Sequence, residues 1–108
     1  MAQVLIIERE DSVRKLLRYA LEREGHTVIE AKYRYEGLYH YRQTPIDVII
    51  ADIPLPESQA EEAITELRRE CPNARIIAIS VLDITKTLKE TQTFQKPFEL
   101  HEFLGAVR

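Results

Sequence analysis

Hydrophobic and polar positions follow two different periods along the chain. Residues 4–7, 46–52 and 75–80 are almost continuously apolar and rich in β-branched side chains. Such runs are typical of strands that are buried on both faces of a sheet. A weaker run at 28–31 and a short one at 93–95 predict two further strands.

Between these runs, apolar residues recur at helical spacing. The pattern predicts helices over residues 13–21, 34–43, 58–70 and 98–107. Asp11 and Ser12 are the expected N-cap of the first helix, and Gly25 stands where that helix should end. Pro45 ends the second helix, and Ser58 is the expected cap of the third. Strands that alternate with helices over short connections predict an α/β fold, with a parallel sheet covered on both faces.

The composition narrows the class of protein. The 108 residues suit a single domain, 1–108, which is either a whole protein or a fragment of a longer one. The one cysteine, Cys71, excludes an internal disulfide and a cysteine zinc site. The longest apolar run has four residues and no secretion signal is seen, so we expect a cytoplasmic protein without a membrane span. A net charge of −3 argues against direct binding of nucleic acid, which needs a concentrated basic face.

Polar residues stand at the carboxyl ends of the predicted strands, which is where ligands bind in open α/β sheets. Glu8 follows the first strand, Asp52 ends the most apolar one, Ser80 ends the fourth and Lys96 follows the fifth. Each of these residue types, taken alone, is also common in turns and caps. Together they predict a site in which a partly desolvated Asp52 carboxylate meets a lysine, a hydroxyl and a second carboxylate.

With these motifs the chain resembles the receiver domain of response regulators, the phosphoacceptor module of two-component signalling. The resemblance covers nearly the whole chain. It rests on the acidic segment after the first strand, Glu36-Gly37-Leu38 where the family has Glu-Ala-Leu, residues 45–53, Pro56, Ser80 and Lys96-Pro97. It implies a flavodoxin-like (CheY-like) three-layer sandwich whose five-stranded parallel sheet has the order 2-1-3-4-5.

The resemblance also implies a role for each site residue. Asp52 would be the phosphoacceptor, and Lys96 and Ser80 would bind oxygens of the phosphoryl group. A Mg²⁺ ion would be held by Glu8, Asp52 and the backbone carbonyl of Pro54. The implied partners are a sensor histidine kinase or phosphotransfer protein, together with an output domain or partner protein. A homodimer is also compatible with the resemblance.

The chain departs from the family pattern at the metal site and before the last strand. Arg9 takes the place of the second carboxylate after the first strand, and a guanidinium has no acceptor atom for a metal ion. Arg9 either pairs with Asp52 and Glu8 in place of the metal or extends into solvent. Only sixteen positions separate Ser80 from Lys96, fewer than in the family. We therefore expect a shortened or missing fourth helix, and an altered output face with apolar surface exposed for a partner.

Three functions remain open from the sequence. The first is a receiver phosphorylated on Asp52, with a degenerate metal site. The second is a pseudo-receiver, which has the same fold and acts as an interaction module without phosphorylation. The third is a flavodoxin-like enzyme or nucleotide binder, disfavoured because no glycine-rich loop follows the first strand. We therefore expect that the chain is not an enzyme.

Overall fold

Five strands and four helices are formed by the residues that the structure, a computed structural model, describes: 1–53, 56–81, 83–84, 88 and 91–108. In chain order they are β1 (Gln3–Ile7), α1 (Asp11–Arg23), β2 (Thr27–Ala31), α2 (Arg34–Gln43), β3 (Val48–Asp52), α3 (Glu57–Glu70), β4 (Arg75–Ser80), β5 (Gln92–Gln95) and α4 (Leu100–Val107). Every element predicted from the hydrophobic pattern is found, with most boundaries shifted by one or two residues.

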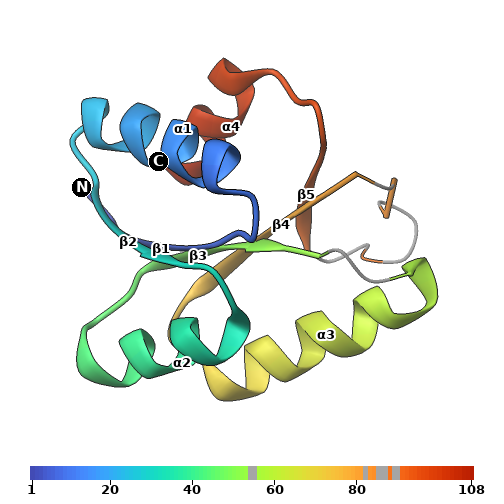
Figure 1. The fold of residues 1–108 in the computed structure, drawn as a ribbon. Coiled ribbons are helices and arrows are strands. Elements are labelled where there is room, and N and C mark those ends of the chain that lie inside the picture. Colours follow the sequence, from blue (N-terminus) through green and yellow to red (C-terminus); the bar gives the residue numbers. More distant parts are fainter. Residues whose placement is uncertain (54–55, 82, 85–87, 89–90) are drawn as a thin grey trace.

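The strands form one parallel sheet in the order β2-β1-β3-β4-β5. Helices α1 and α4 cover one face of this sheet, and α2 and α3 cover the other (Figure 1). The predicted three-layer α/β sandwich and its strand order are therefore confirmed. Because all the strands run in the same direction, their carboxyl ends lie along one edge of the sheet.

Two apolar clusters, one on each face, hold the three layers together. Ile49 and Ile50 are neighbours on β3 and both are fully buried, yet they belong to opposite clusters. Successive side chains of a strand point to opposite faces, so a strand buried on both sides needs an unbroken apolar run. Ile50 lies in the cluster of Leu17 on α1 and Phe103 on α4, whereas Ile49 lies in that of Ile64 on α3.

The helix ends differ from the predictions at three capping residues. Glu10 is the N-cap of α1, so Asp11 and Ser12 lie inside the first turn. Pro56 precedes α3, which begins before Ser58. Neither helix has a side-chain hydrogen bond at its cap, and the cap residues Asp11, Ser12 and Ser58 were therefore predicted wrongly. The end of α1 is as predicted: Gly25 has a φ of 93°, a conformation that glycine adopts readily.

The prediction of a shortened or missing fourth helix falls partly outside the described residues. None of the described residues between β4 and β5 (81, 83, 84, 88 and 91) is part of a helix. Ile84 and Leu88 are buried and belong to the same apolar cluster as Ile64 of α3. These two side chains therefore add to the core, whereas Val81 is 61% exposed. The rest of the apolar surface expected in this segment lies outside the described residues.

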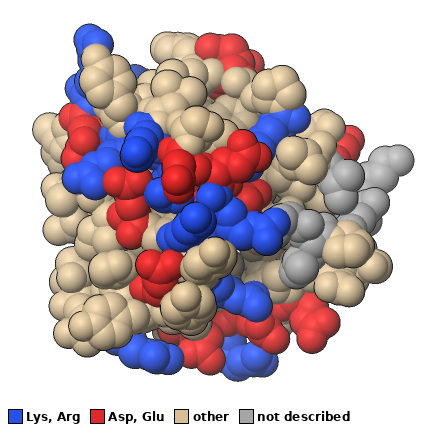
Figure 2. All heavy atoms as spheres, in the orientation of Figure 1, with Lys and Arg blue, Asp and Glu red and all other residues tan. Residues whose placement is uncertain are grey.

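Charges of both signs are interspersed on the face of the molecule shown in Figure 2. Some charged side chains of the molecule pair locally: Arg14 and Arg18 both bind Glu30, at 3.0 and 2.7 Å. Basic side chains on this face therefore stand among acidic ones. Among the described residues, no helix combines the length and the apolar character that a membrane span requires.

Candidate functional site

The sheet brings the predicted site residues to one edge. Asp52 is the last residue of β3 and is paired in register with Ile79 of β4, next to Ser80. Ser80 in turn is paired with Gln95 of β5, which immediately precedes Lys96. The Lys96 amide donates to the Ser80 carbonyl at 2.6 Å and so extends this pairing by one residue. Strand register therefore explains why residues so far apart in the chain meet.

Lys96 binds both carboxylates of the site. Its Nζ lies 2.5 Å from Oε1 of Glu8 and 3.3 Å from Oδ1 of Asp52. The Glu8 side chain is fully buried, and its second oxygen, Oε2, accepts a hydrogen bond from the Glu10 amide at 3.0 Å. The Asp52 and Lys96 side chains are only 11% and 12% exposed. A buried cation thus bridges two buried anions, the arrangement that such charges require.

This arrangement shifts the protonation of both Asp52 and Lys96. Burial and the neighbouring Glu8 carboxylate together raise the pKa of Asp52 to about 6, and Lys96 only partly opposes them. For Lys96, burial works against the charged form, but the hydrogen bond to Glu8 and the charge of Asp52 outweigh it and raise the pKa of the ammonium. Asp52 is therefore held in an environment that resists its ionisation, while Lys96 stays charged.

The Ser80 hydroxyl is buried at the same edge, one strand away from Asp52. Its Oγ donates to the backbone carbonyl of Ile53, the residue after Asp52, at 3.1 Å. The Ile53 amide donates to Ile79 at 2.8 Å, so the chain leaving β3 is tied to β4 at this point. The hydroxyl thus lies where the sequence predicts it and is bonded to the backbone beside the candidate phosphoacceptor.

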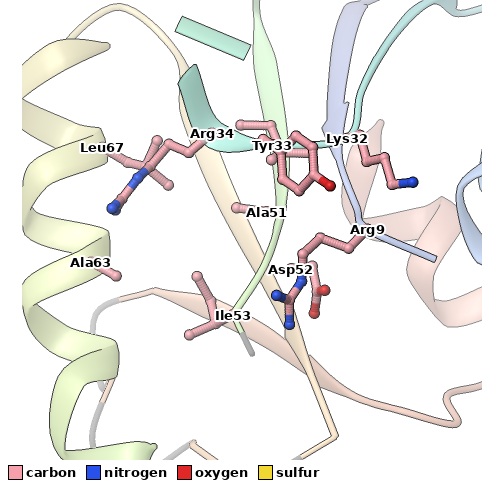
Figure 3. Close-up of a pocket in the computed structure, with 10 residues that line it drawn as sticks. Arg9, Lys32, Tyr33, Arg34, Ala51, Asp52, Ile53, Ala63 and Leu67 are labelled. Carbon is pink, nitrogen blue, oxygen red and sulfur yellow. The ribbon is translucent and has the colours of Figure 1, made fainter. Parts of the chain in front are cut away.

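A pocket of about 160 Å³ opens beside Asp52, and Arg9 lies at its edge. Arg9 and Asp52 both line this pocket, and their side chains overlap in the view of Figure 3. Arg9 is nevertheless exposed, and within the described part of the chain both Asp52 and Glu8 form their ion pairs with Lys96 rather than with Arg9. Arg9 therefore matches neither expectation fully. Lys96 forms the ion pairs with Asp52 and Glu8, and Arg9 is exposed but still lines the pocket.

The candidate metal ligands among the described residues do not fit a Mg²⁺ ion. The Lys96 ammonium already stands between the Glu8 and Asp52 carboxylates, the two side-chain ligands implied for the ion, and Arg9 offers no acceptor. Pro54, whose carbonyl is the third implied ligand, lies outside the described residues. In the ranges that are described, no cluster of three or more His, Cys, Asp or Glu side chains could hold a metal ion. Magnesium requires near-octahedral oxygen coordination, and we therefore derive no step through a metal.

One wall of the pocket was not predicted from the sequence. Lys32, Tyr33 and Arg34 follow β2 and line the pocket beside Asp52. The rule that located Glu8 and Asp52, polar residues after a strand, applies equally to this segment after Ala31. The weak apolar pattern of residues 28–31 made that strand end less conspicuous in the sequence.

Comparisons with known proteins show which family has this fold and sequence pattern. The family model described as "Response regulator receiver domain" matches residues 4–108. The KDP operon transcriptional regulatory protein KdpE of Escherichia coli is 41% identical over 69 residues, which are 64% of this chain and 31% of KdpE. The chemotaxis protein CheY of Halobacterium salinarum is 29% identical over 105 residues, 88% of each chain. The solved structure of the response regulator TrrA from Thermotoga maritima, in complex with Mg²⁺-BeF, covers 99% of this chain and 96% of TrrA with a TM-score of 0.82 at 24% identity. The chain thus spans about a third of the length of KdpE but most of the length of CheY.

Proposed function

Because the chain belongs to the response-regulator receiver domain family, which acts in two-component signalling, we propose that Asp52 accepts a phosphoryl group. The observation that carries this proposal is the Lys96 ammonium held between Asp52 and Glu8. A phosphoryl group on Asp52 would carry its charge on oxygens within reach of this ammonium. Stabilisation of that charge by fixed cations and donors is the main requirement of phosphoryl transfer.

The proposed step uses groups that are already in place. An Asp52 carboxylate oxygen attacks the phosphorus of a phosphorylated histidine on a partner protein. A P–O bond forms, the P–N bond breaks, and its electron pair stays with the imidazole, which takes up a proton. Lys96 then neutralises one phosphoryl oxygen, and the Ser80 hydroxyl turns from the Ile53 carbonyl to donate to another.

We further propose that Arg9 supplies positive charge to the phosphoryl group where the family pattern has a metal ligand. Arg9 lines the pocket beside Asp52, and its guanidinium can donate two parallel hydrogen bonds to phosphate oxygens. With Lys96 it would provide two cations without a bound metal ion. The reason for this role of Arg9 is that the described residues do not provide the octahedral oxygen ligands that Mg²⁺ requires.

A pseudo-receiver is the second candidate, and a specific observation favours it. Lys96 already bridges Asp52 and Glu8, so the Asp52 carboxylate that would attack a phosphodonor is engaged in an ion pair. In that case the same fold would serve as an interaction surface in one fixed state. We place it second because the Asp52 carboxylate lines an open pocket that a phosphodonor can enter.

The experiment treats the purified chain with a small phosphodonor, with and without Mg²⁺, and records its intact mass. We expect the mass of one phosphoryl group to be added in wild type even with a chelator present, and not in Asp52→Asn. The matched control is Asp47→Asn, a change at the exposed carboxylate just before β3, which should behave as wild type. Absence of modification under both conditions would establish the pseudo-receiver instead. Modification only with Mg²⁺ would preserve Asp52 as acceptor and overturn the role of Arg9.

A second variant tests the metal argument from the other side. Arg9→Asp restores an adjacent pair of carboxylates after β1, so we expect phosphorylation of this variant to become dependent on Mg²⁺. Direct Mg²⁺ binding by the variant, measured by calorimetry, should exceed that of wild type. Equal binding by the two chains would contradict this account of the site.

Partners and location follow from the same proposal. The phosphoryl donor would be a sensor histidine kinase or a phosphotransfer protein, and the recipient of the signal an output domain or partner protein, in the cytoplasm. We propose that the chain acts as a switch and not as an enzyme. KdpE is a transcriptional regulatory protein by name, and this chain spans 31% of its length, so an output of that kind is one candidate.

A further inference from the structure

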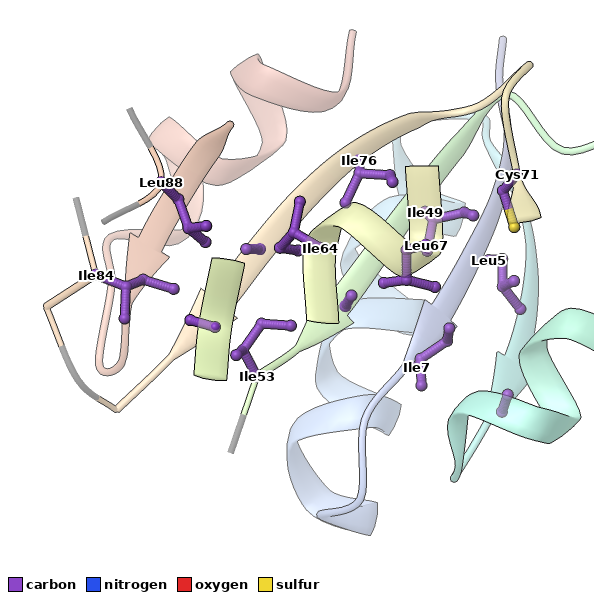
Figure 4. Packing of buried hydrophobic residues seen from close by; sticks show 14 of the residues in the cluster. Leu5, Ile7, Ile49, Ile53, Ile64, Leu67, Cys71, Ile76, Ile84 and Leu88 are labelled. Atoms are coloured by element: carbon purple, nitrogen blue, oxygen red, sulfur yellow. The ribbon is translucent and has the colours of Figure 1, made fainter. Parts of the chain in front are cut away.

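The pocket beside Asp52 has an apolar floor that phosphoryl transfer does not use. Its floor is made by side chains from β1, β3, the residue after β3, and α3: Ile7, Ala51, Ile53, Ala63 and Leu67. All five are buried, and Ile7, Ile53 and Leu67 are part of the packed cluster shown in Figure 4. The floor is thus held in place by the core, and a ligand would meet a surface that is already formed.

The size of the pocket selects a small ring. Its volume is about 160 Å³, and an engineered apolar cavity of about 150 Å³ in another protein binds benzene. A phosphoryl group has no apolar body to place against Ile7, Ala63 or Leu67. The floor therefore fits the ring of an organic molecule better than an inorganic anion.

The mouth of the pocket is cationic. Arg9, Lys32 and Arg34 line it, and Arg34 already pairs with Glu66 at 3.3 Å. Among the described residues, neither Arg9 nor Lys32 has a carboxylate within ion-pair distance, although the Lys32 ammonium stands 6.0 Å over the Tyr33 ring. In Figure 3 Arg34 reaches toward α3, whereas Arg9 lies on the side of the pocket where Asp52 is. Arg9 is thus the cation best placed to bind an anionic group above the floor.

We propose that this pocket binds a small aromatic carboxylate, with its ring on the apolar floor and its carboxylate on Arg9. The planar guanidinium matches a carboxylate in a two-point hydrogen bond, and the Tyr33 ring borders the same opening. The Asp52 carboxylate also lines the pocket and repels an anion, but Lys96 partly neutralises it. Binding itself is independent of the proposed phosphorylation. One consequence of binding does rest on that function: a bound carboxylate would compete with a phosphoryl group on Asp52 for Arg9.

The test is an NMR titration of the unphosphorylated chain with sodium benzoate, without metal or phosphodonor. We expect saturable amide shifts at residues 7–9, 31–34 and 51–53 at millimolar benzoate. Benzamide, which has the ring without the charge, should bind at least about tenfold more weakly, since a hydrogen bond to a charged group accounts for about that factor. Acetate, which has the charge without the ring, should also bind at least about tenfold more weakly, because it buries no apolar surface on the floor. Benzamide binding as well as benzoate would overturn the role of the cation, and the absence of saturable shifts with benzoate would overturn the site.

Four variants separate this inference from its rivals. Arg9→Gln, a change at an exposed residue, should weaken benzoate binding at least about tenfold, whereas Arg69→Gln on the exposed side of α3 should leave it unchanged. Ala63→Leu should block the floor, and its folding is checked by the same spectra. Asp52→Asn removes the phosphoacceptor and the repelling charge together, so it should bind benzoate at least as well as wild type. Loss of binding in Asp52→Asn, or unchanged binding in Arg9→Gln, would refute the proposed pose whether or not Asp52 accepts phosphate.

Discussion

Replacing Asp52 by Asn should stabilise the folded chain at neutral pH. Burial and the adjacent Glu8 raise the pKa of Asp52 from its ordinary 3.8 to about 6. A pKa difference of roughly two corresponds to about 3 kcal/mol. That is the free energy by which the fold disfavours the ionised carboxylate, net of its attraction to Lys96. Asparagine has nearly the same shape and cannot ionise, so the substitution removes this penalty while Lys96 keeps its bond to Glu8.

The sign of the pH dependence follows from proton binding. The folded state holds the Asp52 proton more tightly than the unfolded state, so the stability associated with this group is present below about pH 3.8. It is lost as the pH rises to about 6 and is constant above that. The free energy of unfolding of Asp52→Asn should therefore match wild type near pH 4 and exceed it by about 3 kcal/mol at pH 7.5. Titrating groups that do not contact Asp52 cancel in this comparison because both chains are measured at the same pH.

The assay is urea unfolding of wild type and variant at intervals between pH 4 and pH 8, followed by circular dichroism. Asp47→Asn is the matched control, because Asp47 precedes the same strand at the opposite, exposed end. It should show no such gain. If Asp52→Asn is no more stable than wild type at pH 7.5, or if the difference does not change with pH, then burial and Glu8 do not disfavour the ionised form of Asp52 in the folded chain.

Three further predictions concern packing and charge elsewhere. Lys96→Met should lower the free energy of unfolding by about 3–5 kcal/mol, since Glu8 stays fully buried without its cation; a loss below about 1 kcal/mol in urea unfolding would contradict this. Gly37→Ala should not stabilise the chain although alanine favours helices by about 1 kcal/mol, because the new Cβ would lie 2.6 Å from Cδ1 and 2.8 Å from Cγ1 of Ile7 and crowding costs about 1–3 kcal/mol. A raised melting temperature would count against it, and Ile7→Val, which removes Cδ1 but keeps Cγ1, should relieve the clash only in part. Cys71 should react with iodoacetamide far more slowly in the native chain than in urea, because burial and the nearby Glu70 raise the pKa of its thiol; equal rates at pH 8 would show that the thiol is accessible.

The sequence predicted the strands better than the helix ends. Strand β4 was predicted with its observed bounds, because an unbroken apolar run is needed only where both faces of a strand are covered. The start of β3 was placed two residues early, since Ile46 is buried without being part of the strand. Leu16 fits the helical spacing of α1 yet is 55% exposed, because the width of the buried stripe depends on what packs against the helix.

The residues at the strand ends were also predictable from the chain alone. Glu8, Asp52, Ser80 and Lys96 could be named because alternating strands and helices imply a parallel sheet, and such a sheet collects its carboxyl ends at one edge. That reasoning is local: it uses the periodicity of short segments and the rule that ligands bind at the carboxyl ends of parallel strands. The resemblance to receiver domains, by contrast, drew attention to Arg9 as a substitution at the implied metal position.

Only the tertiary structure decided which of these charges pair. Arg9 is adjacent to Glu8 in the chain, yet Glu8 binds Lys96, which is 88 residues away. The β4–β5 pairing carries Lys96 to the buried side of the site, and the Glu10 amide holds the other Glu8 oxygen. Arg9 lies two residues after the end of β1 and lines the pocket beside Asp52. The direction of a side chain beyond a strand end depends on such distant contacts. The sequence by itself therefore determined which residues form the site, and the tertiary structure determined which of them pair.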